Sequence, residues 1–436
     1  MIEHKNYPTQ AYTHTMRTRT QSNGYIYAQS GRAIDIQNAI DALVADGTMQ
    51  TVLIPEGDFN WVEPGEPWRT VERPAHINII GVTPPDSIVF DDVNQVSAWK
   101  TILRMPFEAP GESIWIRTFG TQKANENPVT ANLAFIGYRD IDPTSTTMYK
   151  NIVMKDVIDF RVHHCLFRNN AKEAVSLGND YGFYLQNPAC LGRGVIDHCK
   201  LINTVGIPAP VGVLTVGYGI SFILEWHADI WEDDIDKVLG TYNRTVFVED
   251  CYMQGWRHCT TMNNGAHTVV RHCVIKHDFG YGSLDAHGVK NSGTRQGSRC
   301  LEAYNNQFLD PENVVVAQQD GIYLRGGGGA IYNNIFRNHN NAILVSLENP
   351  YPYYQPKDLW IWNNTLENVN RLIQTYSGAQ EGVNYYLYDK QYTPYPYPHP
   401  LTTLPITPFS PWRIIAPLFV GLVLVTSFEK KIVGKK

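Results

Sequence analysis

The chain has 436 residues, 43% of them hydrophobic and 18% charged, so it carries enough apolar side chains for a large buried core. Its formal net charge is −6 and no basic stripe is visible, which argues against a nucleic-acid-binding protein. The seven cysteines are an odd number without a C-x-x-C pair, which argues against a zinc knuckle, a thioredoxin-type motif and a full disulfide framework.

The N-terminal part of the chain predicts an arm, a helix and a first strand, in that order. Residues 1–24 are a polar arm without the apolar run of a secretory signal peptide. Residues 33–43 repeat apolar side chains at helical spacing, and Gly47 then ends the helix. Residues 51–59 follow as the first strand segment of a domain that we expect to extend over residues 25–387.

One pattern recurs seven times along the middle of the chain. It consists of a small or apolar residue, a spacer, an apolar residue, two spacers, Cys or Asn, a spacer and another apolar residue, as in Val246-x-Val248-x-x-Cys251-x-Met253. The alternation is typical of a strand with inward apolar residues, and the two-residue break indicates a bend. The Cys or Asn positions are Cys165, Cys199, Cys251, Cys273, Asn306, Asn334 and Asn364.

Such a unit cannot bury its apolar face alone, so the copies must stack as coils of a solenoid. At each bend the Cys or Asn would lie on its counterpart in the next coil, and Asn amides would hydrogen-bond along this ladder. We therefore interpret these cysteines as structural and predict no metal site at these positions. Three of the four His-Cys dipeptides fit this reading, because the His is the outward residue before the ladder.

This arrangement resembles the right-handed parallel β-helix of the pectate-lyase-like superfamily. In that superfamily a short helix closes the open end of the coil stack, and an "IPxGxF"-like strand follows it. Ile54, Pro55, Gly57 and Phe59 match that strand, and the resemblance covers about residues 25 to 370. It implies an all-β solenoid with an N-terminal capping helix. Because the fold carries lyases, hydrolases, esterases, phage spikes and adhesins, function has to be argued from outward-facing residues.

Three strands that precede repeat copies, residues 260–263, 284–287 and 322–325, can be aligned with each other. Adjacent coils lie ~4.8 Å apart, so the alternation predicts a compact outward grid. Its first row is Thr261, Asp285 and Tyr323, and its second row is Asn263, His287 and Arg325.

This grid predicts the catalytic residues of a polysaccharide lyase. Such an enzyme needs a base for the proton α to a uronate carboxylate and cations or donors for the enolate. His287 is the candidate base, Asp285 would orient it, Arg325 would clamp the carboxylate and Tyr323 would protonate the leaving oxygen. A hydrolase is less favoured, because it needs two flanking carboxylates. The alternative is that Asp285, His287 and Arg325 are only paired charges on a solvated face.

Neighbouring loops supply further candidates. An acidic insertion at 225–236 is a candidate Ca²⁺ site, although such runs are more often solvated loops. Loops beside the grid are typical walls of a binding site on a solenoid. The candidate substrate-binding residues are Asn263, Lys290, Arg295, Arg299, Trp226 and Trp231.

The C-terminal part has a distinct composition. Residues 388–411 carry proline at alternate positions, which predicts a stiff extended linker or a strap along the body. Residues 412–436 contain the uncharged run 414–428, followed by lysines. We expect a C-terminal membrane anchor with a cytoplasmic basic tail; the alternative is an apolar helix or strand packed on the fold.

The sequence therefore predicts a surface or extracellular carbohydrate-acting β-helix protein, anchored to the membrane by its C-terminus. A lyase of uronate-containing polymers is the first reading. A non-catalytic glycan-binding, adhesin-like or spike-like surface protein is the second. Polysaccharide or surface glycan is the expected partner in both cases, and nucleic acid is not.

Overall fold

The computed structural model describes most of the chain between Gly24 and Thr403. The described ranges are 24–48, 50–83, 95–108, 113–121, 126–145, 149–170, 173–178, 192–204, 217–223, 235, 238–263, 265–276, 282–288, 297–310, 320–347 and 355–403. The expected anchor at 412–436 and the arm up to residue 23 lie outside these ranges. Within the described residues, no helix has both the length and the apolar character needed to cross a bilayer.

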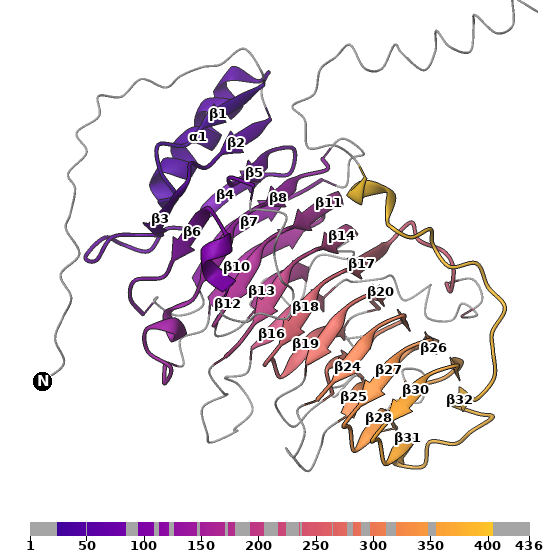
Figure 1. Ribbon diagram of the computed structural model, residues 1–436. Coiled ribbons are helices and arrows are strands. Elements are labelled where there is room, and N and C mark those ends of the chain that lie inside the picture. Colours follow the sequence, from indigo (N-terminus) through magenta and orange to yellow (C-terminus); the bar gives the residue numbers. More distant parts are fainter. Residues whose placement is uncertain are drawn as a thin grey trace, which may run out of the picture.

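The described strands form three parallel sheets that wind around one core (Figure 1). Sheet A contains β1 (Tyr25–Tyr27), β2 (Thr51–Leu53), β5 (Asn78–Ile80), β8 (Val129–Ala131), β11 (Ile158–His163), β14 (Arg193–Asp197), β17 (Thr245–Glu249), β20 (His267–Arg271), β23 (Cys300–Tyr304), β26 (Gly328–Tyr332), β29 (Leu359–Trp362) and β32 (Tyr385–Tyr386). Sheet B contains β3 (Gly57–Asn60), β6 (Thr101–Arg104), β9 (Ala134–Ile136), β12 (Leu166–Arg168), β15 (Lys200–Ile202), β18 (Tyr252–Gln254), β21 (Val274–Lys276), β24 (Gln307–Leu309), β27 (Ile335–Arg337) and β30 (Thr365–Glu367). Sheet C contains β4 (Val71–Pro74), β7 (Ser113–Phe119), β10 (Tyr149–Lys155), β13 (Glu173–Gly178), β16 (Tyr218–Ile223), β19 (His258–Asn263), β22 (Leu284–Ala286), β25 (Asp320–Leu324), β28 (Asn341–Ser346) and β31 (Arg371–Tyr376).

The chain visits the three sheets in turn, so one coil contributes one strand to each. Strands that neighbour each other in a sheet therefore come from successive coils, as β17, β20 and β23 do in sheet A. The seven predicted repeat copies begin at residues that pair with each other, for example Val246 with Thr268 and Thr268 with Leu301. This register confirms the predicted parallel β-helix.

The predicted ladder of buried Cys and Asn is present at the bend between sheets A and B. The backbone N–H of Cys273 donates to Oδ1 of Asn306 at 3.0 Å. The Asn306 amide donates to Oδ1 of Asn334 at 3.0 Å, and the Asn334 amide donates to Oδ1 of Asn364 at 3.0 Å. Each amide thus connects two coils, and the buried polar groups of the bend are paired.

The residue before each ladder position has a left-handed backbone conformation, with φ between 50° and 57°. Asn, Asp and His adopt this conformation more readily than other non-glycine residues. This preference explains why His precedes Cys at three bends. The residues concerned are His164, His198, Asp250, His272, Asn305, Asn333 and Asn363.

The helix α1 (Ala33–Asp46) lies at the N-terminal end of the stack (Figure 1). It buries Ile36, Ile40 and Leu43 in the main hydrophobic core. Gly47 ends it in the left-handed conformation and donates its N–H to the Leu43 carbonyl at 2.9 Å.

Residues 388–403, here called the strap, run back along the outer face of sheet A after the last coil (Figure 1). Their short helix η5 (Pro400–Thr402) reaches β14 and β11. Arg271 donates to the carbonyls of Tyr395 at 2.6 Å and Pro396 at 2.8 Å. The proline-rich segment is thus held through its carbonyl groups.

Replacement of Asn334 by Ala tests the ladder. We expect a lower free energy of unfolding, by roughly 1–3 kcal/mol for each buried group left unpaired, because the Asn306 N–H and the Ala303 carbonyl both lose a partner. Urea titration measures the effect. The control is Asn370→Ala, which removes an exposed hydrogen bond to Asn340 and should change stability by less than about 0.5 kcal/mol. Equal effects of the two substitutions would contradict the ladder's importance.

Candidate functional site

The predicted grid is present on the outer face of sheet C. Thr261 in β19 pairs with Asp285 in β22, and Asp285 pairs with Tyr323 in β25. The second row continues this register, because the N–H of His287 donates to Met262 at 3.0 Å and the N–H of Arg325 donates to Ala286 at 2.9 Å. The alternate residues point inward as predicted. Those in the main core are Met262, Leu284, Ala286, Ile322 and Leu324.

Asp285 and Arg325 form the centre of this site. The guanidinium donates Nε–H to Oδ1 at 3.1 Å and Nη2–H to Oδ2 at 2.6 Å, which is a bidentate ion pair. Thr261 donates its hydroxyl to the same carboxylate at 3.4 Å. Asp285 is 1% exposed and Arg325 7%, so the pair is buried and does not lie on a solvated face.

The burial of this pair has an electrostatic consequence. Burial alone would raise the pKa of Asp285, but the charge of Arg325 and the neighbouring His258 and His287 hold that pKa well below its usual value. Asp285 is therefore an ionised, acceptor-only group at neutral pH. It is suited to holding Arg325 in place and not to donating a proton.

Tyr323, His287 and Asn263 are the partly exposed members of the grid. The Arg325 guanidinium lies 4.6 Å from the centre of the Tyr323 ring, a cation–π contact that orients the phenol. His287 hydrogen-bonds through Nδ1 to the carbonyl of Gly288. This bond orients the His287 ring, while the Asp285 oxygens bond to Arg325 and Thr261.

Glycine allows the close approach of neighbouring coils beside β22. A Cβ atom on Gly282 would come within 2.6 Å of the Tyr323 Cβ, so only glycine fits at this point. Tyr323 is consequently set directly against the backbone of the preceding coil.

The sequence analysis missed His258 and Tyr218, which extend the site toward the N-terminal coils. Their rings stack at 5.7 Å, and His258 Nδ1 donates to the Gly282 carbonyl at 2.5 Å. Burial lowers the pKa of His258 to about 4, so the ring is neutral at pH 7. Strict alternation gives His258 the same inward parity as Thr260 and Met262, so the signal that placed Thr261 could not have found this pair of rings, although Tyr218 and His258 are register partners.

The other predicted substrate-binding residues fall into two groups. Arg299 is buried, with 1% exposure, beside the start of β23. Its side chain is therefore not presented on the surface. The other four residues lie outside the described part of the chain; they are Lys290, Arg295, Trp226 and Trp231. The candidate Ca²⁺ loop at 225–236 also lies outside it, except for Ile235.

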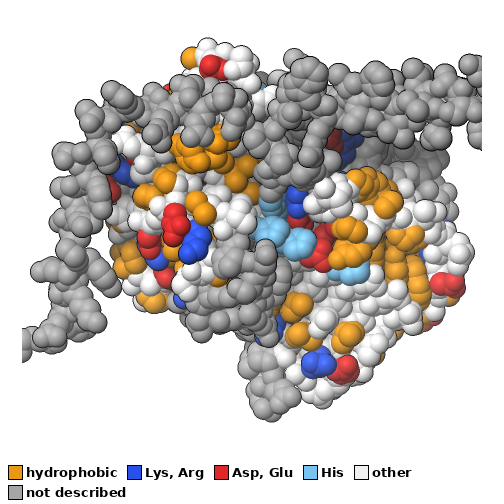
Figure 2. Space-filling view, turned by 45° about the horizontal axis from the view of Figure 1, so that its top comes forward, with side chains coloured by type: hydrophobic (Ala, Val, Ile, Leu, Met, Phe, Trp, Pro, Cys, Tyr) orange, Lys and Arg blue, Asp and Glu red, His pale blue; other side chains and the backbone are white. Residues whose placement is uncertain are grey.

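A second concentration of ionisable groups lies where sheet A bends into sheet B. His164 and His198 stack in parallel at 5.0 Å, and His198 bonds to Asp197 at 2.9 Å. The bond to Asp197 raises the pKa of His198. Arg161 makes two 2.8 Å bonds to the same carboxylate. Figure 2 shows histidine side chains beside acidic and basic ones on one face of the molecule.

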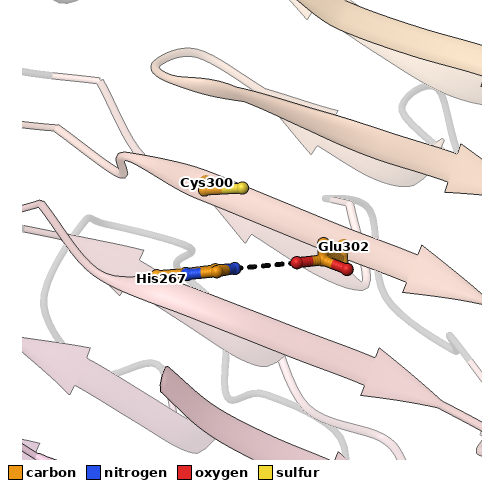
Figure 3. A group of neighbouring side chains, drawn as sticks. All are labelled: His267, Cys300 and Glu302. Carbon is orange, nitrogen blue, oxygen red and sulfur yellow. Dashed lines mark hydrogen bonds and ion pairs between the residues drawn. The ribbon is translucent and has the colours of Figure 1, made fainter. Parts of the chain in front are cut away.

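Outside both groups, the described residues bring three potential metal ligands together. His267, Cys300 and Glu302 lie on adjacent strands of sheet A, with their ligand atoms within 4.8 Å of one another (Figure 3). The same register that aligns the repeat copies pairs His267 with Cys300. The sequence analysis missed this group because it compared outward residues only along sheet C.

No family model and no curated protein matches this chain. Several solved structures do resemble it. A protein of Geobacillus virus E2, ORF18, has 10% identity and a TM-score of 0.40 over 82% of this chain and 62% of its own length, so this chain spans less than two thirds of it. PfbA, a surface adhesin of Streptococcus pneumoniae, has 10% identity and a TM-score of 0.43 over 80% and 93%. An alginate lyase from Paenibacillus sp. str. FPU-7 has 12% identity and a TM-score of 0.37 over 83% and 99%. These likenesses concern the fold, which the three parallel sheets establish by themselves.

Replacement of Arg325 by Met tests the buried ion pair. The uncompensated Asp285 charge should lower the free energy of unfolding by roughly 3–5 kcal/mol, and the double variant Asp285→Asn/Arg325→Met should recover much of this loss. Urea titration measures both. Arg337→Met, which breaks an exposed pair with Glu367, is the matched control and should cost at most about 1 kcal/mol. A loss at Arg325 no larger than that at Arg337 would contradict the importance of burial.

The depressed pKa of His258 predicts a dependence of stability on pH. The unfolded ring takes up a proton below its ordinary pKa of about 6.5, whereas the folded ring resists protonation until about pH 4. The folded state should therefore lose stability as the pH falls from 6.5 to 4, by up to about 3 kcal/mol from this residue. His258→Asn keeps a donor for Gly282 and should flatten this part of the stability profile. His76→Asn, the same substitution at an exposed position, is the matched control.

Proposed function

We propose that the protein acts on a polysaccharide that lies against the outer face of sheet C around Tyr323, His287 and Asn263. One observation carries this proposal: the three partly exposed side chains surround the buried Asp285–Arg325 pair on three consecutive coils. Functional groups on strands that are supported by a second layer of bonds are held more precisely than groups on loops.

The chemical character of the surface fits a sugar polymer. The Tyr323 ring offers an apolar face for sugar C–H groups, and imidazole and amide groups pair with hydroxyls. Successive coils repeat such positions at ~4.8 Å along a straight sheet, which suits an extended linear ligand. The cation–π contact with Arg325 already restricts the Tyr323 side chain in the free protein. Binding a ligand therefore costs less side-chain conformational entropy.

The finer proposal is lyase chemistry on a uronate-containing polymer. The His287 Nδ1 proton is directed to Gly288, which leaves Nε2 as the basic nitrogen for the proton α to the carboxylate. Tyr323 would protonate the leaving oxygen. Arg325 would act mainly by holding Tyr323, because its charge is already paired with Asp285.

The second candidate is a non-catalytic glycan-binding or adhesin-like surface protein. The pairing of Arg325 with Asp285 favours it, because an enolate then has no unpaired guanidinium from this residue to stabilise it. The expected position at the cell surface and the anchor at 412–436 belong to both proposals. Binding is common to the two, and product release separates them.

A panel of uronate-containing and neutral polysaccharides, screened for binding and for unsaturated product, tests the proposal. We expect His287→Gln to reduce product formation roughly 100-fold or more, because the base is lost, while binding persists. Tyr323→Phe should lower turnover and keep binding, whereas Tyr323→Ala should weaken both.

The matched control is Gln374→Ala, at the same row position two coils from Tyr323. This variant should keep binding and turnover. Binding without product in the unaltered protein would support the glycan-binding alternative. A protein that neither binds nor cleaves any polymer of the panel would refute the proposal.

A further inference from the structure

A buried group of three side chains lies on the outer face of sheet A, beside the strap. His267 in β20 is the register partner of Cys300 in β23, and Glu302 follows two residues later on the same strand face. All three side chains are 0% exposed. His267 Nε2 and Glu302 Oε1 are 3.0 Å apart, and the sulfur of Cys300 completes a group of N, S and O atoms within 4.8 Å (Figure 3).

Neighbouring residues fix the orientation of two of these side chains. The Thr245 hydroxyl hydrogen-bonds to Nδ1 of His267 at 2.9 Å, so Nε2 faces Glu302. Tyr242 donates its hydroxyl to Oε2 of Glu302 at 3.1 Å. Metal-binding imidazoles and carboxylates are characteristically held by such outer partners.

The charge of Glu302 distinguishes this group from its surroundings. Its hydrogen-bond partners among the described residues are an imidazole and a phenol, neither with a permanent positive charge. Glu249, on the same face of sheet A, instead bonds to the guanidinium of Arg271 at 2.5 and 3.0 Å. A buried carboxylate without such a counter-charge is costly, and a bound cation would supply one.

The thiol adds chemical selectivity. Cys300 is buried and forms no disulfide among the described residues. A borderline-soft divalent cation binds such a residue as the thiolate and displaces its proton to solvent.

We propose that His267, Cys300 and Glu302 bind one divalent cation of the zinc class. A set of one imidazole, one thiolate and one carboxylate suits Zn²⁺ better than Ca²⁺ or Mg²⁺, which take oxygen ligands. Tyr242 and the strap close the outer side: the Tyr242 hydroxyl lies 3.5 Å from the Thr393 carbonyl, and its ring packs edge-on against Tyr395 at 4.9 Å. The cation would join β20 to β23 beneath the strap and is independent of the proposed glycan surface on sheet C.

Reconstitution of the full chain with Co²⁺ tests this site, because a thiolate bound to Co²⁺ gives a charge-transfer band in the near ultraviolet. The experiment uses a Cys190→Ser background, since Cys190 lies outside the described residues. Metal is added during refolding, because the site is buried. We expect one Co²⁺ per chain with the thiolate band, and displacement of Co²⁺ by Zn²⁺.

Matched variants separate the site from general effects on folding. Cys300→Ala should abolish the band, whereas Cys259→Ala, a buried cysteine of the main core, should keep it. Glu302→Gln preserves the shape of the side chain and should abolish the rise in melting temperature on adding Zn²⁺. Thr245→Val should weaken Co²⁺ binding by roughly 10–100-fold, as expected for an outer partner.

Three outcomes would overturn the inference. They are the absence of a thiolate band in the background protein, an equal band in Cys300→Ala, and an unchanged Zn²⁺-dependent rise in melting temperature in Glu302→Gln. The metal-free melting temperature of each variant shows whether it is folded, so a loss of binding in a folded variant is attributable to the missing ligand.

Discussion

The register between successive coils is the constraint on which the structure depends. Each strand pairs in parallel with the corresponding strand of the next coil, so a residue is positioned by its place in the repeat and not by its distance along the chain. A shift by one residue would turn every inward side chain outward. The ladder from Cys273 through Asn306 to Asn364 prevents such a shift, because its buried amides can pair only when the bends coincide.

The fold was predictable because its signals are local. The period of two, the bend and the recurring Cys or Asn can all be read within eight residues, and coils such as those beginning at Thr268 and Leu301 stack as aligned. The neighbour relations within the grid on sheet C were predictable for the same reason. The burial of Asp285 was not, because it depends on residues of neighbouring coils that are distant in sequence, including Thr261 and Arg325. The pairing of His267 with Cys300 was implicit in the alignment.

Buried charges are placed differently on the two outer faces. On sheet C, Asp285 and Arg325 satisfy each other and leave Tyr323 and His287 at the surface. On sheet A, Glu249 and Arg271 also pair, and Arg271 in addition donates to two carbonyls of the strap. The first arrangement orients exposed groups, and the second attaches a covering segment. The strap therefore covers part of sheet A, whereas Tyr323 and His287 on sheet C are partly exposed.

The proline content of the strap explains why side chains of sheet A, and not its backbone, hold the strap in place. Prolines at positions 394, 396, 398 and 400 remove backbone N–H groups, so this segment cannot join the sheet as another strand. Its carbonyl groups still need hydrogen-bond donors, and Arg271 donates to two of them. The backbone N–H of His399 donates to Glu249 at 3.0 Å. Covering the face in this way removes water from the polar side chains beneath. Each of them then requires a partner of its own, and among the described residues Glu302 is a fully buried carboxylate on this face whose hydrogen-bond partners carry no fixed positive charge.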